Sequence, residues 1–236
     1  MIVSAHQPSY YPWLGWIHKV INSDKFILMD EVQLADRAFQ HRNIFLTKEG
    51  GTKYLSIPFQ KKGYRDLKIR ELKLNENINW QKENLDFIEV NYKKHLFFDE
   101  VYDEVKVLYS KKYQTVFEVL HETTLLVFSM LEIKTELILQ SSLDYKRDVT
   151  KGDLILEMIK AVGANCYLSG IGAKAYMDES LFEKEGIKIV YQEFDHPIYS
   201  QKNSKEFVSG LNCLDLLFNL GIEGSRNFIK QIKDEA

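Results

Sequence analysis

The chain has 236 residues, of which 31 are lysine or arginine and 34 are aspartate or glutamate, so its formal net charge is −3. This near balance argues against a nucleic-acid binder held mainly by phosphate neutralisation, because such proteins carry a large basic excess. Hydrophobic residues make up 45% of the chain, which argues against intrinsic disorder and predicts a globular protein.

Targeting features are not apparent in the sequence. Two cysteines, Cys166 and Cys213, do not make a disulfide framework, and we interpret both as buried apolar residues of a cytosolic protein. Gln7 and Pro8 interrupt the apolar start, so no signal peptide is expected. The longest strongly apolar stretch, residues 125–131, is far shorter than the about 20 residues that a bilayer requires. We expect a cytoplasmic protein without a membrane partner.

The first thirty residues predict a strand, a helix and a second strand. The apolar run 2–5 stops at His6, and Pro8 cannot continue a central strand. Apolar residues recur at helical spacing over 11–21, and the run 25–29 ends in Asp30 and Glu31. A βαβ unit with polar residues after each strand is typical of a parallel α/β sheet.

The rest of the chain alternates between the same two patterns. Gly50 and Gly51 predict the turn of a hairpin within an otherwise irregular stretch, 32–75. Further strands are expected at 54–57, 135–140, 166–168 and 187–191. Helices are expected within 79–131 and at 152–162, 173–185, 211–220 and 225–232. We therefore predict an α/β fold with a Rossmann-like, open, mainly parallel sheet. Residues 1–236 would form one domain with a helical insertion at about 79–131 and C-terminal helices.

Ligands of open α/β sheets bind beyond the carboxyl ends of the strands, at a topological switch point. This rule selects polar residues after four of the expected strands: His6, Gln7 and Tyr10; Asp30 and Gln33; Ser169 and Gly170; His196, Tyr199 and Gln201. Imidazole at His6 suits phosphate binding or acid–base chemistry, and the alternative is a structural histidine at a turn. Asp30 is preferred over Glu31 because adjacent residues point to opposite faces, and its alternative is a solvated turn.

Two further segments indicate anion binding. Arg37, Arg42 and Asn43 belong to a dense polar stretch, and arginine side chains match phosphate or carboxylate geometry. A solvated surface loop is the competing interpretation. Ser169 and Gly170 open a glycine turn whose backbone N–H groups are suited to an anion, and a plain tight turn explains it equally well. The full dinucleotide fingerprint and the Walker A ending are absent. Scattered histidines and unpaired cysteines predict no metal site.

The sequence resembles the WbqC-like family along nearly its whole length. The resemblance is carried by the opening run HQPSYYPWLG at residues 6–15, by Arg42-Asn43, by YLSG at residues 167–170, by His196-Pro197 and by LDLLFN at residues 214–219. Asn212 departs from the serine expected there. Members of this family resemble proteins encoded in surface-polysaccharide gene clusters. A glycine-transferase role in O-antigen assembly has been suggested for one member. The opening also has a fainter similarity to pantothenate synthetase, which activates a carboxylate with ATP and joins it to an amine, although the second histidine of that motif is absent.

The resemblance implies an aminoacyl or acyl transferase that modifies an amino sugar or nucleotide sugar. The expected substrates are that sugar and a small amino acid, ATP is a candidate cofactor, and a nucleic-acid partner is not expected. His6 and Asp30 are the catalytic candidates, and the remaining residues would bind substrate or phosphate: Gln7, Tyr10, Gln33, Arg37, Arg42, Asn43, Ser169, Gly170, His196, Tyr199 and Gln201. Two alternatives stay open: a non-catalytic nucleotide-sugar-binding subunit, and a nucleotidyl or amino-acid transferase acting on another nucleotide substrate.

Overall fold

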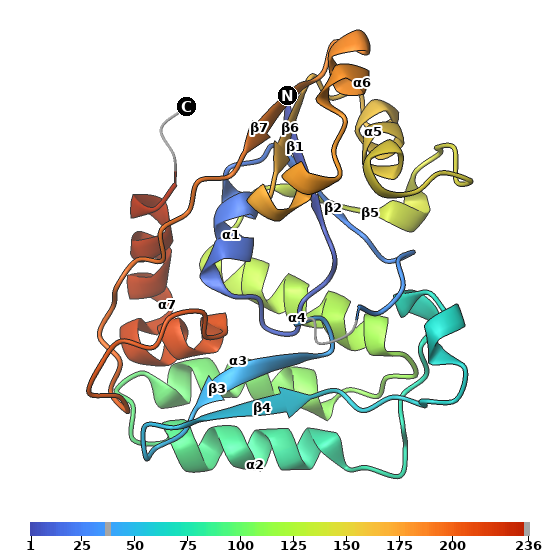
Figure 1. Ribbon diagram of the computed structural model, residues 1–236. Coiled ribbons are helices and arrows are strands. Elements are labelled where there is room, and N and C mark those ends of the chain that lie inside the picture. Colours follow the sequence, from blue (N-terminus) through green and yellow to red (C-terminus); the bar gives the residue numbers. More distant parts are fainter. Residues whose placement is uncertain (36–38, 234–236) are drawn as a thin grey trace.

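A five-stranded parallel sheet forms the centre of the molecule (Figure 1). The computed structural model describes residues 1–35 and 39–233. The strands, in the spatial order of the sheet, are β5 (Glu136–Leu139), β2 (Lys25–Leu28), β1 (Ile2–His6), β6 (Cys166–Ser169) and β7 (Lys188–Tyr191). The chain builds the sheet outward from β1 on one side and then resumes from β1 on the other. The strand order therefore reverses between β1 and β6, and the predicted Rossmann-like open sheet is confirmed.

The sheet is buried on both faces, as parallel sheets usually are. Val3 and Ala5 alternate with Ser4 along β1, and all three are buried. On one face, Val3 and Ala5 pack in a cluster with α5 (Lys151–Ala161) and with α6 (Glu179–Lys184), which contributes Phe182. On the other face, α1 (Leu14–Ile21) joins a larger cluster with α4 (Val116–Leu131) and α7 (Cys213–Gln231).

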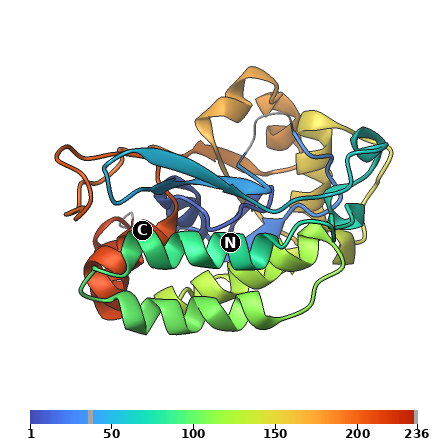
Figure 2. The same cartoon turned by 90° about the horizontal axis from the view of Figure 1, so that it is seen from below.

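A hairpin and a helical layer are inserted in the chain between β2 and β5. The hairpin of β3 (Arg42–Leu46) and β4 (Thr52–Ser56) turns at the predicted Gly50 and Gly51. It leads into α2 (Trp80–Tyr92), α3 (Phe98–Ser110) and α4. A capping box of Thr115 and Glu118 starts α4. Figure 1 shows the hairpin, α2 and α3 at the end of the molecule away from the N-terminus, and Figure 2 shows the hairpin packed along this layer.

Three segments differ in detail from the predicted elements. Residues 173–185 form a short 3-10 helix, η4 (Ile171–Ala175), and then α6, because the Asp178 side chain accepts the Ser180 N–H and starts a new helix. The irregular stretch contains two 3-10 turns, η1 (Tyr64–Asp66) and η2 (Ile69–Glu71), and β5 runs into a third, η3 (Gln140–Ser142). The two predicted C-terminal helices are continuous except for a kink at Gly221. Within the described residues, no helix is long and apolar enough to cross a membrane.

Candidate functional site

A cleft of about 660 Å³ opens at the point where the strand order reverses. His6 lines it from the end of β1, and Gly170 lines it from just beyond β6. The first turn of α5 contributes Lys151, Leu154 and Ile155. Cavities of this size hold small molecules and cofactors, and this is the position where open α/β sheets bind them. The cleft is therefore the candidate site.

His6 enters the cleft as a neutral imidazole. Its Nδ1 lies 2.9 Å from the Gln7 carbonyl oxygen, and a carbonyl can only accept, so Nδ1 carries the proton. Burial and the nearby Lys19 ammonium lower the pKa of His6 to about 4, against the raising effect of the Gln7 carbonyl. The Nε2 lone pair is then available to accept a proton from a substrate.

Lys19 lines the cleft but is not among the predicted residues, because it lies in a helix and does not follow a strand. It lies in the last turn of α1, is only 5% exposed and lines the cleft. Burial lowers the pKa of the Lys19 ammonium to about 8. Its Nζ lies 3.1 Å from the point where a β-carbon on Gly170 would stand, so glycine leaves room for it. The signal in the sequence is a lysine within the mostly apolar helical segment LGWIHKVI at residues 14–21.

Gln7 connects the cleft to the loop that follows β2. Gln40 donates from Nε2 to Gln7 Oε1 at 2.8 Å, and Gln40 Oε1 accepts the backbone N–H of Ala35 at 2.8 Å. The Gln7 carbonyl also accepts the indole N–H of Trp16 at 3.2 Å. Gln7 therefore lines the cleft and holds the rim in place at the same time.

Comparison with known proteins identifies the family. A model of the WbqC-like protein family matches residues 7–227. The chain belongs to the WbqC-like protein family. It is also 30% identical, over 222 residues, to the uncharacterized protein Rv1507c of Mycobacterium tuberculosis (strain ATCC 25618 / H37Rv), with 94% of each chain covered. No solved structure matches it significantly. Lys19 and Gly170 lie inside the segment matched by the WbqC-like family, and His6 immediately precedes it.

Asp30 of this WbqC-like protein does not line the cleft. Its Oδ1 accepts the Ser141 backbone N–H at 2.8 Å, and Oδ2 lies 3.6 Å from the Arg70 guanidinium. Neighbouring Glu31 pairs with Lys68 at 2.8 Å and with Arg147. These carboxylates tie the end of β2 to η3 and η2, so the expected catalytic role of Asp30 finds no support in the geometry of the cleft.

Tyr10 and Asn43 lie in the interior of the protein. Tyr10 is fully buried, and its hydroxyl contacts the Tyr109 hydroxyl and the Asn84 amide. Asn43 donates from Nδ2 to the carbonyls of Tyr10 and Tyr11 at 3.0 and 2.8 Å. These contacts fix the segment between β1 and α1 to the hairpin, which explains Tyr10 and Asn43 without a ligand.

Arg42 and Gln33, both within the described residues, do not line the cleft either. Arg42 lies 4.7 Å over the Tyr54 ring on the hairpin. Gln33 is exposed and pairs with Lys68 in an isolated bridge. Arg37 lies outside the described residues. Of the predicted anion site, the described residues Arg42 and Asn43 are therefore not part of the cleft.

The residues predicted after the later strands are also placed elsewhere, except Gly170. Ser169 is fully buried, and its hydroxyl donates to the Gly170 carbonyl at 3.3 Å. The His196 ring lies 6.4 Å from the Trp13 ring, and its Nδ1 contacts the Pro197 carbonyl. Strand-end position alone did not separate these packed side chains from those that line the cleft.

Tyr199 and Gln201 belong to a buried network around Asp215 of α7. Asp215 accepts hydrogen bonds from the Tyr199 hydroxyl at 2.9 Å, from Gln201 Nε2 at 3.2 Å and from the Tyr92 hydroxyl at 3.3 Å. Burial raises the pKa of Asp215 to about 6, although the hydrogen bonds from these three donors act to lower it. The network joins α7 to α2 and to the chain after β7, so it is structural.

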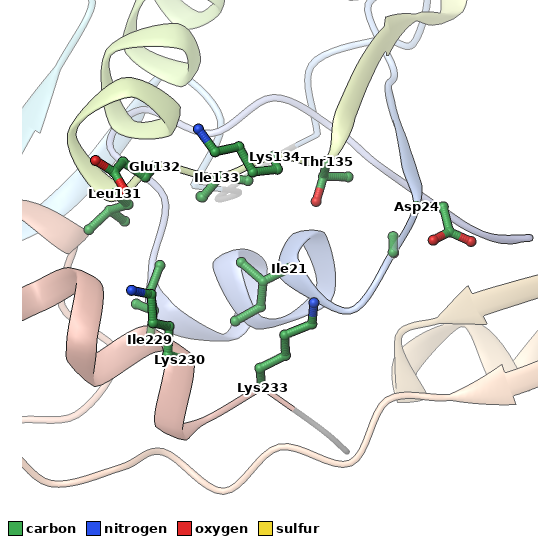
Figure 3. A pocket seen from close by; sticks show the side chains of 11 residues that line it. Ile21, Asp24, Leu131, Glu132, Ile133, Lys134, Thr135, Ile229, Lys230 and Lys233 are labelled. Carbon is green, nitrogen blue, oxygen red and sulfur yellow. The ribbon is translucent and has the colours of Figure 1, made fainter. Parts of the chain in front are cut away.

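A second cavity, of about 360 Å³, lies at the opposite edge of the sheet. Figure 3 shows Ile21 of α1 between the segment that follows α4 and the last turn of α7. Asp24 and Thr135 precede β2 and β5, so the amino ends of strands border this cavity. Its acidic residues are engaged, because Asp24 accepts the Ile2 N–H at 2.7 Å and Glu132 pairs with Arg226 at 2.8 Å. Among the described residues, no cluster of potential metal ligands is found in either cavity or elsewhere.

Proposed function

We propose that this WbqC-like protein is an aminoacyl or acyl transferase, which joins glycine or a similar small amino acid to the amino group of an amino sugar or nucleotide sugar for surface polysaccharide. The observation that carries the proposal is that a neutral His6 and Gly170, at the ends of neighbouring strands, line one cleft at the strand-order switch point. The family name supports the pathway.

The roles of the residues follow from the requirements of acyl transfer. The acceptor amine must lose a proton as it attacks the activated carboxyl carbon, and His6 Nε2 would take it, since Nδ1 already donates to Gln7. Negative charge develops on the carbonyl oxygen, and a backbone N–H at Gly170 would stabilise it. The leaving group departs with the electron pair of the broken C–O bond. An ATP-derived acyl phosphate is the form of activation that the fainter similarity suggests.

The proton-accepting role of His6 can be tested by product analysis. Purified protein is incubated with glycine, ATP and a panel of amino sugars and nucleotide amino sugars, and mass spectrometry searches for a glycyl conjugate. His6→Gln should lower conjugate formation about 100-fold or more, the usual range for loss of a general base, with a nearly unchanged Tm. His121→Gln, a change of a partly buried histidine on α4, is the matched control and should retain full activity.

The result also separates the alternatives. Ligand-induced stabilisation by a nucleotide sugar, without any conjugate under these conditions, would reject the transferase and favour a binding subunit. The His6→Gln protein could instead unfold at a much lower temperature and keep full activity per folded molecule. That result would show that the role of His6 is structural.

A further inference from the structure

The ammonium group of Lys19 has no counter-ion in the described part of the chain. The Lys19 residue is only 5% exposed, and within residues 1–35 and 39–233 neither an ion pair nor a side-chain hydrogen bond involves its ammonium group. Buried charges in proteins are normally paired, because burial without a partner is strongly unfavourable. None of the described residues lining the cleft is acidic, and Lys151 adds a second positive charge.

The first turn of α5 lies at the same cleft and adds a second feature that favours an anion. This helix has 11 residues, and its N-cap residue Thr150 makes no side-chain hydrogen bond to the first turn. The first amide groups of a helix have no partner within the helix, and together with the helix dipole they favour an anion. Lys151, Leu154 and Ile155 place this turn at the cleft wall.

The remaining walls suit the rest of a nucleotide-sized molecule. Met29 and Ile155 are buried apolar residues of the wall, and Tyr176 is half exposed at its edge. Gly170 has no side chain and therefore keeps the space in front of Lys19 Nζ open. The cleft has a volume of about 660 Å³. A ligand with an apolar part and a charged group at one end would contact both the apolar wall and the positively charged wall.

We infer that Lys19 and the first turn of α5 form a phosphate subsite of the cleft, which binds the phosphate groups of a nucleotide or nucleotide-linked substrate. The inference adds a ligand subsite to the proposed function. It rests on that function only for the location of the substrate in this cleft. Bound phosphate supplies the missing counter-charge of Lys19. It also reduces the field of that ammonium at His6, which makes the imidazole a stronger base when substrate is present.

Isothermal titration calorimetry with ADP, pyrophosphate, adenosine and glycine tests the subsite. Wild-type protein should bind ADP and pyrophosphate, and should bind adenosine and glycine at least tenfold more weakly. Lys19→Met should weaken ADP at least tenfold, since it removes one charge-assisted contact. Lys82→Met, which removes an exposed lysine of α2, is the matched control and should change ADP affinity less than twofold.

A second variant keeps the test valid if Lys19→Met fails to fold. Gly170→Ala would place a methyl group 3.1 Å from Lys19 Nζ, so the ammonium must shift by a few tenths of an ångström, and the methyl group narrows the space for a phosphate; ADP should bind more weakly. The subsite is refuted if wild-type protein binds neither ADP nor pyrophosphate, if adenosine binds as tightly as ADP, or if both variants keep wild-type affinity. ADP binding that depends on Lys19, without any glycyl conjugate, would uphold the subsite and reject only the transferase.

Discussion

At the scale of single residues, Lys19 combines two opposite effects. A lysine in its place is unfavourable for the empty protein, because burial lowers the pKa of its ammonium to about 8 from the ordinary value of 10.5. The same ammonium becomes favourable when an anion occupies the cleft. Residues that lower stability in the absence of a ligand are typical of binding sites.

Lys19→Met should therefore stabilise the unliganded protein. The folded state binds the lysine proton more weakly than the unfolded state, so the penalty is fully present below pH 8 and is lost as the pH rises toward 10.5. At 1.36 kcal/mol per pKa unit, it reaches about 3 kcal/mol near pH 7. Urea unfolding at pH 7 and pH 10 measures it, and the advantage of the variant should shrink at the higher pH. A variant less stable than wild type at pH 7 would indicate a structural lysine.

His6 should make acid unfolding steeper. Its pKa of about 4 lies below the ordinary value of 6.5, so the unfolded state takes up the proton first as the pH falls. The stability that His6 contributes is present above pH 6.5 and declines between pH 6.5 and 4. Wild type and His6→Gln should therefore have similar stability above pH 6.5 and diverge over this range, with wild type becoming the less stable of the two. Parallel pH profiles of the two proteins would show that His6 titrates normally.

Tyr199 illustrates a residue whose predicted binding role the structure replaces by a structural one. Tyr199→Phe removes one donor from the buried Asp215 carboxylate, and the unfolding free energy should fall by about 1–3 kcal/mol. The affinity of the folded protein for ADP should not change, because the Asp215 network does not line the cleft. Urea unfolding and calorimetry measure the two quantities, and a selective loss of ADP affinity would contradict this assignment.

At the scale of elements, the kink of α7 depends on one glycine. Gly221 has φ 72° and ψ 173°, a region that is essentially limited to glycine, and an added β-carbon would lie 2.7 Å from the Phe97 ring. Gly221→Ala should therefore lower the unfolding free energy by at least about 2 kcal/mol. Gly224→Ala in the same helix is the control and should cost less than about 1 kcal/mol. Equal effects in thermal unfolding would mean that the kink is not required.

The elements themselves could largely be read from the sequence, and the side chains at their ends could not. Apolar periodicity and turn glycines are local signals, and they predict strands such as β1 and helices such as α5 well. Whether a polar residue after a strand faces the cleft depends on its partners, which are distant in sequence. Asp30 Oδ1 accepts the Ser141 N–H, Asn43 Nδ2 donates to the Tyr10 carbonyl, and neither residue lines the cleft.

At the scale of the whole molecule, the insertion and the sheet share one core. Trp16 beside the sheet and Trp80 at the start of α2 both belong to the same hydrophobic cluster. Unfolding transitions followed by far-ultraviolet circular dichroism and by tryptophan fluorescence should therefore coincide in urea. A helical signal that is lost well before the fluorescence changes would mean that the insertion folds as a separate unit.

The central claim is that the chemistry of this WbqC-like protein takes place in the cleft between β1 and β6. A crystal structure of the protein grown with ADP tests it most directly. We predict phosphate oxygens within hydrogen-bonding distance of Lys19 Nζ and beside the first turn of α5. ADP bound instead in the cavity at the amino ends of β2 and β5, or on the hairpin, would contradict the claim.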